Sequence, residues 1–231
     1  SVSWADEVLV VDSQSTDTTP QIATGIGARV ITRQWEGFAS QKQFAIDQAR
    51  NDWVLSLDAD ERVSPELKAE ILSLGSRKPD GYRIPRLSFY MGRPMRHSGW
   101  YPDKQLRLFD RRKGKWKEVK VHESFTMREG SIVEDLRSDI LHYSVENASH
   151  HHRMVGERYA PLAAEQMFID GKDTSPLRIA LAGPAAFVRS YILKLGFLDG
   201  LPGLAVAAFA SHHAFLKNLL LWEMRSKARG N

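Results

Sequence analysis

The sequence predicts an α/β protein, in which a mixed sheet is flanked by helices and followed by a helical region. Two apolar runs, Glu7–Asp12 and Trp53–Glu61, are typical of strands that end in acids, and helical sequence separates them. From 81 to 143 apolar residues alternate, which indicates half-buried strands and a sheet that turns antiparallel or mixed. We therefore predict one domain over residues 1–147 and a helical region over residues 148–231.

The composition is that of a globular protein. Of the 231 residues, 42% are hydrophobic and 26% are charged, which argues against intrinsic disorder. The absence of cysteine excludes disulfides and thiolate metal sites, and the net charge of +4 indicates anionic partners. The chain begins at Ser1 with no basic-then-apolar leader, so we expect no signal peptide and a truncated amino terminus.

The first run ends on Asp12, and a small polar loop leads from it to Thr19-Pro20, a typical helix start. Such a loop can offer hydroxyls and backbone N–H groups to a nucleotide, or it simply connects a strand to a helix. Asp12 and Ser13 are the candidate nucleotide contacts. Lys42, on a predicted helix over 40–49, is either a solvated lysine or a phosphate contact.

The second run, Trp53–Glu61, predicts a central buried strand that carries Asp58 and Asp60 at its carboxyl end. Ligands bind beyond the strand ends of open α/β sheets. Because alternate strand residues point the same way, the two carboxylates can converge on one hard cation. The alternative is a solvated pair of turn acids. Ser64-Pro65 then predicts a capped helix.

The segment from Trp100 to Arg107 gathers aromatic, acidic and cationic residues. Aromatic faces beside hydrogen-bonding groups suit a sugar ring, although the same residues could form a corner that packs the sheet. The candidate substrate-binding residues are Trp100, Tyr101, Gln105 and Arg107, with Asp103 as a candidate base.

Two further predicted strands end in polar residues. His122 and Glu123 end one of them, as a candidate substrate contact and a candidate base. His142 ends the other and could complete a metal site with the aspartates, whereas a single histidine there is more often structural. The run His150–His152 predicts a helix start.

The stretch from Leu177 to Trp222 is largely apolar with spaced Lys and Arg, and Gly183-Pro184 and Gly200–Gly203 predict breaks within it. This pattern favours interfacial or re-entrant helices whose basic residues meet anionic headgroups. The alternative is a helical subdomain that packs on the sheet.

Together these motifs resemble family 2 glycosyltransferases of the GT-A fold, which is Rossmann-like. The likeness spans nearly the whole chain, and its later blocks are similar to the subgroup that adds glucose, in β-1,4 linkage, to the lipopolysaccharide inner core. The motifs are Val10–Asp17, Leu57–Glu61, Gly99–Asp103, Arg107–Phe109, Val121–Glu123 and Tyr191–Gly200.

The resemblance implies that Asp12 contacts the nucleoside, Asp58 the ribose or metal, and Asp60 the divalent cation. It places Glu123 near the acceptor as a base. The family's first strand, with its Thr-x-Asn-Glu segment, is absent, so we expect weak nucleotide binding. The Gln-x-x-Arg-Trp motif of processive synthases is also absent, since Gln105 leads into a different sequence, and single-sugar transfer is therefore favoured.

The predicted function is inverting, metal-dependent transfer of one hexose, glucose, from a nucleotide-diphosphate sugar, UDP-glucose, to a lipid-linked glycan such as lipopolysaccharide core. Mg²⁺ or Mn²⁺ is the expected cofactor, held by Asp60, Asp58 and His142. The expected location is peripheral, on the cytoplasmic face of the bacterial inner membrane, against an anionic lipid surface.

Three other functions fit the sequence less well. An Asp-x-Asp phosphatase would carry a threonine where Arg62 stands. A sugar nucleotidyltransferase has a similar fold but carries a Gly-rich loop on its first strand. A basic membrane- or nucleic-acid-binding module would leave the acid-ended strands unexplained, and nucleic acid is not an expected partner.

Overall fold

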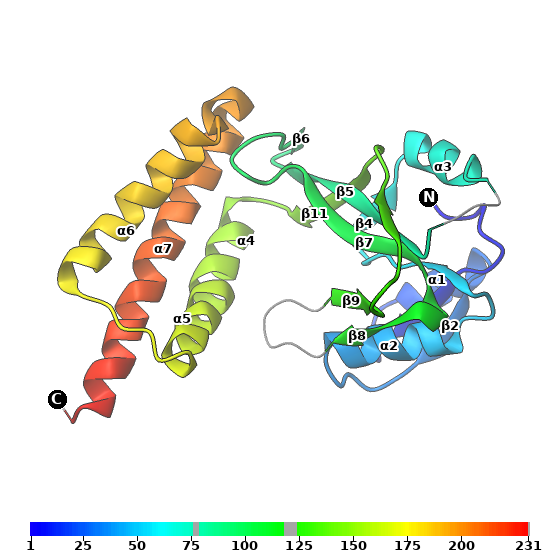
Figure 1. Cartoon of the computed structure of the whole chain (residues 1–231), viewed down its shortest axis with the longest axis horizontal. Helices are drawn as coiled ribbons and strands as arrows, with labels where there is room; N and C mark the ends of the chain where they lie inside the picture. Colours follow the sequence, from blue (N-terminus) through cyan, green and yellow to red (C-terminus); the bar gives the residue numbers. More distant parts are fainter. Residues whose placement is uncertain (76–78, 118–123, 231) are drawn as a thin grey trace. The chain divides into compact units, whose positions relative to one another are not determined.

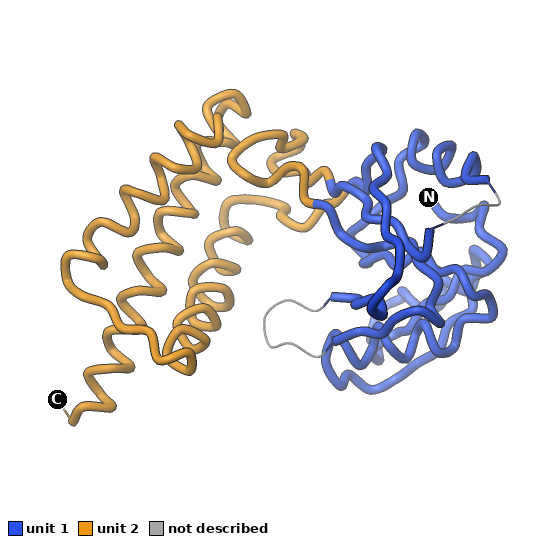
Figure 2. The backbone as a smooth tube through the Cα atoms, in the orientation of Figure 1, with its two compact units in different colours: residues 1–86, 104–141 blue, residues 87–103, 142–231 orange. Residues whose placement is uncertain are grey.

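The computed structural model describes residues 1–75, 79–117 and 124–230, and its fold is mixed α/β (Figure 1). The chain forms two compact units (Figure 2). Unit 1 comprises residues 1–86 and 104–141, and unit 2 comprises residues 87–103 and 142–231. The segment 87–103 thus packs with the helical part of the chain. The predicted domain division between 147 and 148 stays a prediction.

The amino-terminal part of unit 1 is a βαβ arrangement. Strand β1 (Leu9–Asp12) pairs in parallel with β2 (Arg29–Thr32), and α1 (Thr19–Gly25) connects them. Pro20 stands in the first turn of α1, where its missing N–H costs nothing. This parallel pair places Asp12 at a strand end.

Two helices follow the predicted pattern. Helix α2 (Phe38–Gln48) contains Lys42, as predicted, and ends one residue before the predicted range of 40–49. Helix α3 (Pro65–Leu72) begins after Ser64, whose hydroxyl accepts a hydrogen bond from the Leu67 N–H at 3.1 Å. The predicted Ser-Pro cap is therefore confirmed.

The larger sheet has the order β3-β7-β5-β11-β4, with β6 and β10 paired to β5. Its pairings include the antiparallel β3 with β7 and the parallel β10 with β5, so the predicted mixed sheet is confirmed. Among the described strands β3 stands at the end of the order, so its predicted central position is wrong. The strands are β3 (Trp53–Leu55), β4 (Glu61–Val63), β5 (Gly81–Tyr90), β6 (Arg93–Pro94), β7 (Asp103–Asp110), β10 (Val133–Asp135) and β11 (Ile140–Val145).

A hairpin of β8 (Gly114–Lys117) and β9 (Ser124–Met127) completes unit 1. A 3₁₀ turn, η1 (Arg111–Lys113), joins β7 to β8. Phe109 and Phe125 stack with ring centroids 3.7 Å apart and pack with Trp116 against α2. This cluster fixes the helix that carries Lys42.

Unit 2 is built on helices. Helices α6 and α7 lie side by side (Figure 1), and Gly183 lets them approach, because a Cβ there would lie 3.0 Å from Oγ of Ser211. Helix α6 continues through Pro184, so the predicted break at Gly183-Pro184 is wrong. The elements are α4 (Ala148–Arg153), the π-helical η2 (Met154–Tyr159), α5 (Ala160–Ile169), α6 (Pro176–Val188), the π-helical η3 (Arg189–Leu193), the 3₁₀ turn η4 (Gly196–Asp199) and α7 (Gly200–Ala228).

Candidate functional site

The loop after β1 is shaped by Asp12, whose side chain is buried. One carboxylate oxygen accepts a hydrogen bond from the Ser15 N–H at 3.0 Å, and the other accepts one from the Ser15 hydroxyl. The intervening Gln14 has a φ of 63°, in the left-handed region. Asp12 thereby holds the loop in the turn that presents Ser13.

Gln41 joins this loop to α2. Its Nε2 donates a hydrogen bond to Oγ of Ser13 at 3.0 Å. Its Oε1 is buried and has no hydrogen-bond partner among the described residues. A buried amide oxygen normally finds a donor. Gln41 therefore ties α2 to the Asp12 loop through its amide nitrogen, while its buried oxygen stays unpaired among the described residues.

The next residue on α2, Lys42, reaches the second acid-ended segment. Its Nζ lies 2.7 Å from Oδ1 of Asp58 and 4.9 Å from the ring centroid of Trp116. The side chains of Lys42 and Asp58 are 24% and 31% exposed, so a ligand can reach this pair from solvent. Sequence analysis placed both residues at a nucleotide site but not in contact.

The other oxygen of Asp58 belongs to a buried network. Nη2 of Arg107 lies 2.8 Å from Oδ2 of Asp58 and 2.7 Å from Oε1 of Glu61. Glu61 also pairs with Nη1 of Arg86 at 3.2 Å, and its Oε2 accepts the Asp58 N–H at 2.9 Å. The cations Lys42, Arg86 and Arg107 thus face the carboxylates of Asp58 and Glu61. The net charge of these five side chains is +1.

These charges set the protonation state of Asp58. Burial raises the pKa of its carboxyl, but the charges of Arg107 and Lys42 outweigh that effect and hold the pKa well below its usual range. Asp58 therefore stays a carboxylate at physiological pH, and it keeps both cationic partners.

The geometry around Asp60 differs from the sequence expectation. Strand β3 ends at Leu55, and the Glu61 N–H donates to the Asp58 carbonyl at 3.0 Å, which closes a turn over 58–61. The alternation expected of a strand therefore does not apply to Asp58 and Asp60. Asp60 is exposed on this turn, while Asp58 is turned into the ion-paired cluster.

Among the described residues no group of three or more His, Cys, Asp or Glu side chains could hold a metal ion. His142, the third predicted ligand, belongs to unit 2, and its Nδ1 lies 3.3 Å from Oγ of Ser88 on β5. The predicted metal roles of Asp58, Asp60 and His142 stay predictions.

The predicted sugar-binding residues are divided between the two units. Trp100 packs against Tyr90 and His151 in unit 2, with ring centroids 5.9 Å away in both cases. Tyr101 lies under the guanidinium of Arg96 at 5.5 Å. These contacts pack Trp100 and Tyr101 within unit 2, and their predicted sugar-binding roles stay predictions.

The remaining substrate residues follow Tyr101. Asp103 and Gln105 lie on β7, as does Arg107, which the structure assigns to the Asp58 cluster. The predicted sugar-binding roles of these residues stay predictions. His122 and Glu123 lie outside the described residues.

Sequence reasoning missed Gln41, Glu61 and Arg86. Gln41 precedes Lys42, and Glu61 follows Asp60 directly, so proximity to the candidate residues was the available signal. Arg86 gave none, because its role depends on the pairing of distant strands. The partners of Arg107 were hidden for the same reason.

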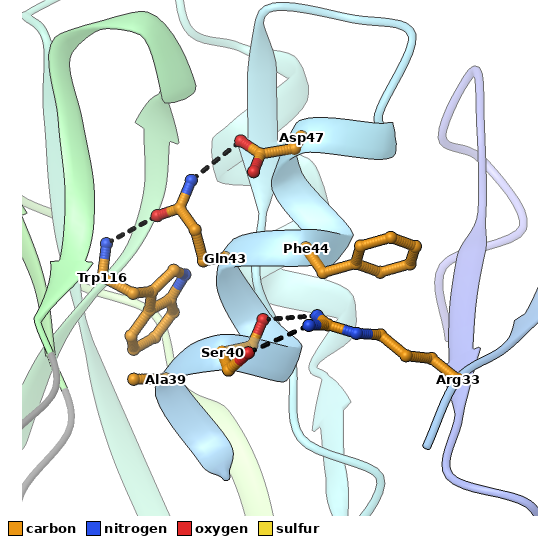
Figure 3. A pocket seen from close by; sticks show the side chains of 7 residues that line it. All are labelled: Arg33, Ala39, Ser40, Gln43, Phe44, Asp47 and Trp116. Carbon is orange, nitrogen blue, oxygen red and sulfur yellow. Dashed lines mark hydrogen bonds between the residues drawn. The ribbon is translucent and has the colours of Figure 1, made fainter. Parts of the chain in front are cut away.

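A pocket of about 340 Å³ lies beside α2 (Figure 3). Polar groups of its lining form hydrogen bonds with one another. Gln43 accepts from the backbone N–H of Trp116 and donates to Asp47, and Arg33 donates to Ser40. The lining residues are Arg33, Ala39, Ser40, Gln43, Phe44, Asp47 and Trp116. None of the predicted site residues is among them.

Comparison with known proteins places the chain among glycosyltransferases. An uncharacterized glycosyltransferase of Rickettsia typhi is 30% identical over 97% of this chain and 80% of its own length. A lipopolysaccharide core biosynthesis glycosyltransferase of Rhizobium meliloti is 29% identical over 97% of this chain and 86% of its own length. The crystal structure of S. aureus TarS 1-349 covers 97% of this chain and 82% of that chain at 16% identity, with a TM-score of 0.41. Residues 4–135, more than half of the chain, match glycosyl transferase family 2, and the protein is therefore a glycosyltransferase that belongs to this family.

Proposed function

We propose that this glycosyltransferase moves a single hexose, glucose, with inversion from UDP-glucose to a lipid-linked glycan such as lipopolysaccharide core. The observation that carries the proposal is the cluster of Lys42, Asp58 and Arg107, with the Asp12 loop joined to the same helix through Gln41. The Rhizobium relative, named for lipopolysaccharide core biosynthesis, supports the acceptor class. Family membership favours this activity over nucleotidyl transfer and over a non-catalytic basic module.

The proposed architecture is a GT-A domain over residues 1–147. In it the β1 loop and the turn after β3 would face the nucleotide. Asp12 shapes the loop, Ser13 and Gln41 offer polar groups, and Asp58 offers a carboxylate. This arrangement suits a nucleoside, whose base and ribose carry N–H and O–H groups.

Transfer breaks the bond between the anomeric carbon and a diphosphate oxygen, so negative charge develops on the leaving group. Lys42 is the partly exposed cation best placed to receive that charge, because its contacts among the described residues are Asp58 and the face of Trp116. Arg107 adds positive potential from the buried side.

Asp60 fits a site for Mg²⁺ or Mn²⁺. Its carboxylate is a hard oxygen ligand on an exposed turn, and Mg²⁺ is commonly held by one or two carboxylates together with substrate phosphates. Asp58 fits less directly, because cations already face both of its oxygens. When bound, the ion would neutralise charge on the leaving diphosphate.

The acceptor hydroxyl must lose its proton as the new bond forms. We assign this role to Glu123, with Asp103 as the competing base. Inversion requires only one such group, on the face of the sugar opposite the leaving diphosphate.

Two features of unit 2 support association of the protein with a membrane. In the described part of the chain Gly196–Ala228 is long and apolar enough to cross a bilayer by length and composition, a test that core helices of soluble proteins also pass. The connection from η3 into α7 carries several large, exposed apolar side chains, and Arg189 and Lys194 lie in the same stretch of sequence. The apolar side chains are Ile192, Leu193, Leu195, Phe197, Leu198 and Leu201, each 45–72% exposed, and we call them the apolar tip. We propose that the apolar tip lies in the cytoplasmic face of the bacterial inner membrane.

The function is tested with nucleotide sugars and Mn²⁺ on the purified chain. A donor at a hundredfold its dissociation constant should stabilise the protein by roughly 2.7 kcal/mol. Asp60→Asn should abolish the metal-dependent part of that stabilisation and leave the fold intact, while Asp6→Asn, at an exposed site, should change neither. Parental transfer rates in Asp60→Asn would refute the metal role, and a panel in which no nucleotide sugar stabilises the chain would refute the donor class.

A further inference from the structure

We propose that unit 2 carries a site for the headgroup of an anionic lipid, in which Arg93, Arg96 and Lys194 bind the phosphate and the apolar tip receives the acyl chains. The inference rests on the membrane location in the proposed function. It adds a choice of headgroup, because it assigns to this surface a preference for a phosphate monoester over a diester.

The site forms where the segment 87–103 packs on the turn that opens α7. The Ser98 N–H donates a hydrogen bond to the carbonyl of Lys194 at 2.9 Å. Strand β6 lies beside the same turn (Figure 1), since a Cβ on Gly200 would lie 3.7 Å from Nη1 of Arg93. Arg93 and Lys194 come from distant parts of the sequence, and these contacts bring them to one surface of unit 2.

Packing fixes the position of the Lys194 side chain. It lies directly over Gly99 and fills the space that a Cβ there would need, with its Cδ 2.7 Å from that position. Gly99 also has a φ of 79°, which glycine adopts without strain. Among the described residues neither Lys194 nor the exposed Arg93 and Arg96 makes an ion pair. The ammonium group is therefore held in place without a carboxylate.

The acids of this region do not balance these cations. Residues 87–102 and 174–222 contain Asp199 and no other Asp or Glu. The Asp199 side chain is 6% exposed, and both of its oxygens face His97, at 2.9 Å from the backbone nitrogen and 2.8 Å from the ring Nδ1. The next acid, Asp103, begins β7. The surface is therefore positive and attracts anions.

The backbone of the same surface is strained. Met91, Ser98 and Leu195 have φ values of 50°, 59° and 55°, in the left-handed region that residues other than glycine rarely adopt. Gln14, in the loop after β1, is the one other such residue in the described part of the chain. Strained residues persist where the surrounding structure holds them, and they cluster at sites that bind ligands. Their position supports a binding role for this surface.

The neighbours of Lys194 indicate what kind of anion fits. Leu193 and Leu195 belong to the apolar tip and are 72% and 45% exposed. Cations beside exposed leucines suit a ligand that is anionic at one end and apolar at the other, as a lipid phosphate is. A phosphate monoester carries a charge of about −1.5 to −2 at pH 7, whereas a diester carries a single charge. Three cations without carboxylate partners therefore favour the monoester.

The test is cosedimentation of the purified chain with phosphatidylcholine vesicles that contain phosphatidic acid or, at matched surface charge, phosphatidylglycerol. The parent should bind the phosphatidic acid vesicles about tenfold more tightly, or about 1.4 kcal/mol. Lys194→Met with Arg96→Gln removes two exposed cations and should bind both kinds of vesicle equally. Its denaturant unfolding should match that of the parent, because neither side chain is buried.

Two controls complete the test. Lys227→Met removes an exposed lysine at the opposite end of α7 and should keep the parental preference. Soluble glycerol phosphate, at the concentration of the phosphatidic acid, should not displace the protein from the vesicles. Displacement would indicate a site for soluble phosphates and overturn the lipid assignment.

The remaining outcomes separate this inference from the proposed function. Equal binding of the two kinds of vesicle by the parent, or an unchanged preference in the double variant, would overturn the headgroup site. Either result would leave the apolar tip and the transfer reaction standing. Failure of the parent to bind any vesicle would overturn the proposed membrane location as well.

Discussion

His97 and Asp199 are joined by two contacts across 102 residues of sequence. The backbone N–H of His97 donates to Oδ2 of Asp199 at 2.9 Å, and its ring Nδ1 lies 2.8 Å from Oδ1. The Asp199 side chain is only 6% exposed. A single carboxylate thus fixes the segment 87–103 to the turn that opens α7.

Replacing this carboxylate should loosen unit 2. Asp199→Ala leaves the His97 N–H without its acceptor, which should cost about 1–3 kcal/mol of unfolding free energy. Hydrogen exchange at the His97 amide should accelerate accordingly, while Asp6→Ala, at an exposed site, should leave it unchanged. Unaltered exchange in Asp199→Ala would mean that other contacts hold the segment.

Removing Arg107 should destabilise unit 1 strongly. Arg107→Met leaves the buried Glu61 with Arg86 as its remaining ion-pair partner among the described residues, so denaturant unfolding should show a loss of about 3–5 kcal/mol. The double variant Glu61→Leu with Arg107→Met removes both charges and should lose less than the two single variants together. Arg128→Met, on the exposed end of the β9 hairpin, is the matched control.

The stability of unit 2 should depend on His151. Burial against Tyr90, Trp100 and Phe209, with His150 nearby, lowers the pKa of its imidazole to about 4. The unfolded chain takes up this proton near pH 6.5, so between those values it binds more protons than the folded chain. Stability should therefore fall as the pH falls from 6.5 to 4, by up to about 3 kcal/mol.

His151→Phe keeps a ring at this position and removes the proton site. Urea unfolding measured from pH 7 to pH 4 should give a flatter profile for this variant than for the parent. His152→Phe, at the exposed neighbouring position, should retain the parental slope. Parallel profiles for the parent and His151→Phe would contradict the assignment.

The apolar tip should bind anionic bilayers. Leu193→Glu with Leu198→Glu places charge at two of its exposed positions and should reduce cosedimentation with phosphatidylglycerol vesicles more than tenfold. The control is Ile22→Glu with Ile26→Glu, which alters exposed apolar residues on and after α1 in unit 1. Equal loss in both double variants would point to general charge repulsion.

The two candidate bases are separated by single-turnover kinetics. Glu123→Gln should slow transfer by roughly 10²–10⁴ with donor affinity near normal, because it removes basicity but keeps size. Asp103→Asn is the paired variant. Near-parental turnover in Glu123→Gln would move the role to Asp103, and loss of donor binding would make Glu123 a ligand of the nucleotide sugar.

Local signals in the sequence predicted much of the fold. The Ser64-Pro65 cap was visible from its capping residues, and the mixed larger sheet was visible from periodicity. The end of β3 was not visible, because the apolar run continues to Leu57 while the strand ends at Leu55. The run reflects burial, which a turn can share with a strand.

The sequence predicted which residues belong to the site, but not which of them contact one another. Asp58 carries the acid that the sequence singled out, yet its environment comes from Arg107 and Lys42, on elements far along the chain. Pro184 shows the opposite error, since packing of α6 on α7 retains a helix where local propensity predicts a break. Tertiary contacts decided both outcomes.

Unit 2 is built from two separate stretches of the chain, residues 87–103 and 142–231, and this limits how its sequence can be recombined. Tyr90 and Met95 come from the segment 87–103, yet they are buried with Val145 and Val206 in the core of unit 2. Recombination near residue 147 would separate Val206 from Tyr90, Met95 and Val145. The helices of unit 2 therefore cannot be exchanged as a cassette without the segment 87–103.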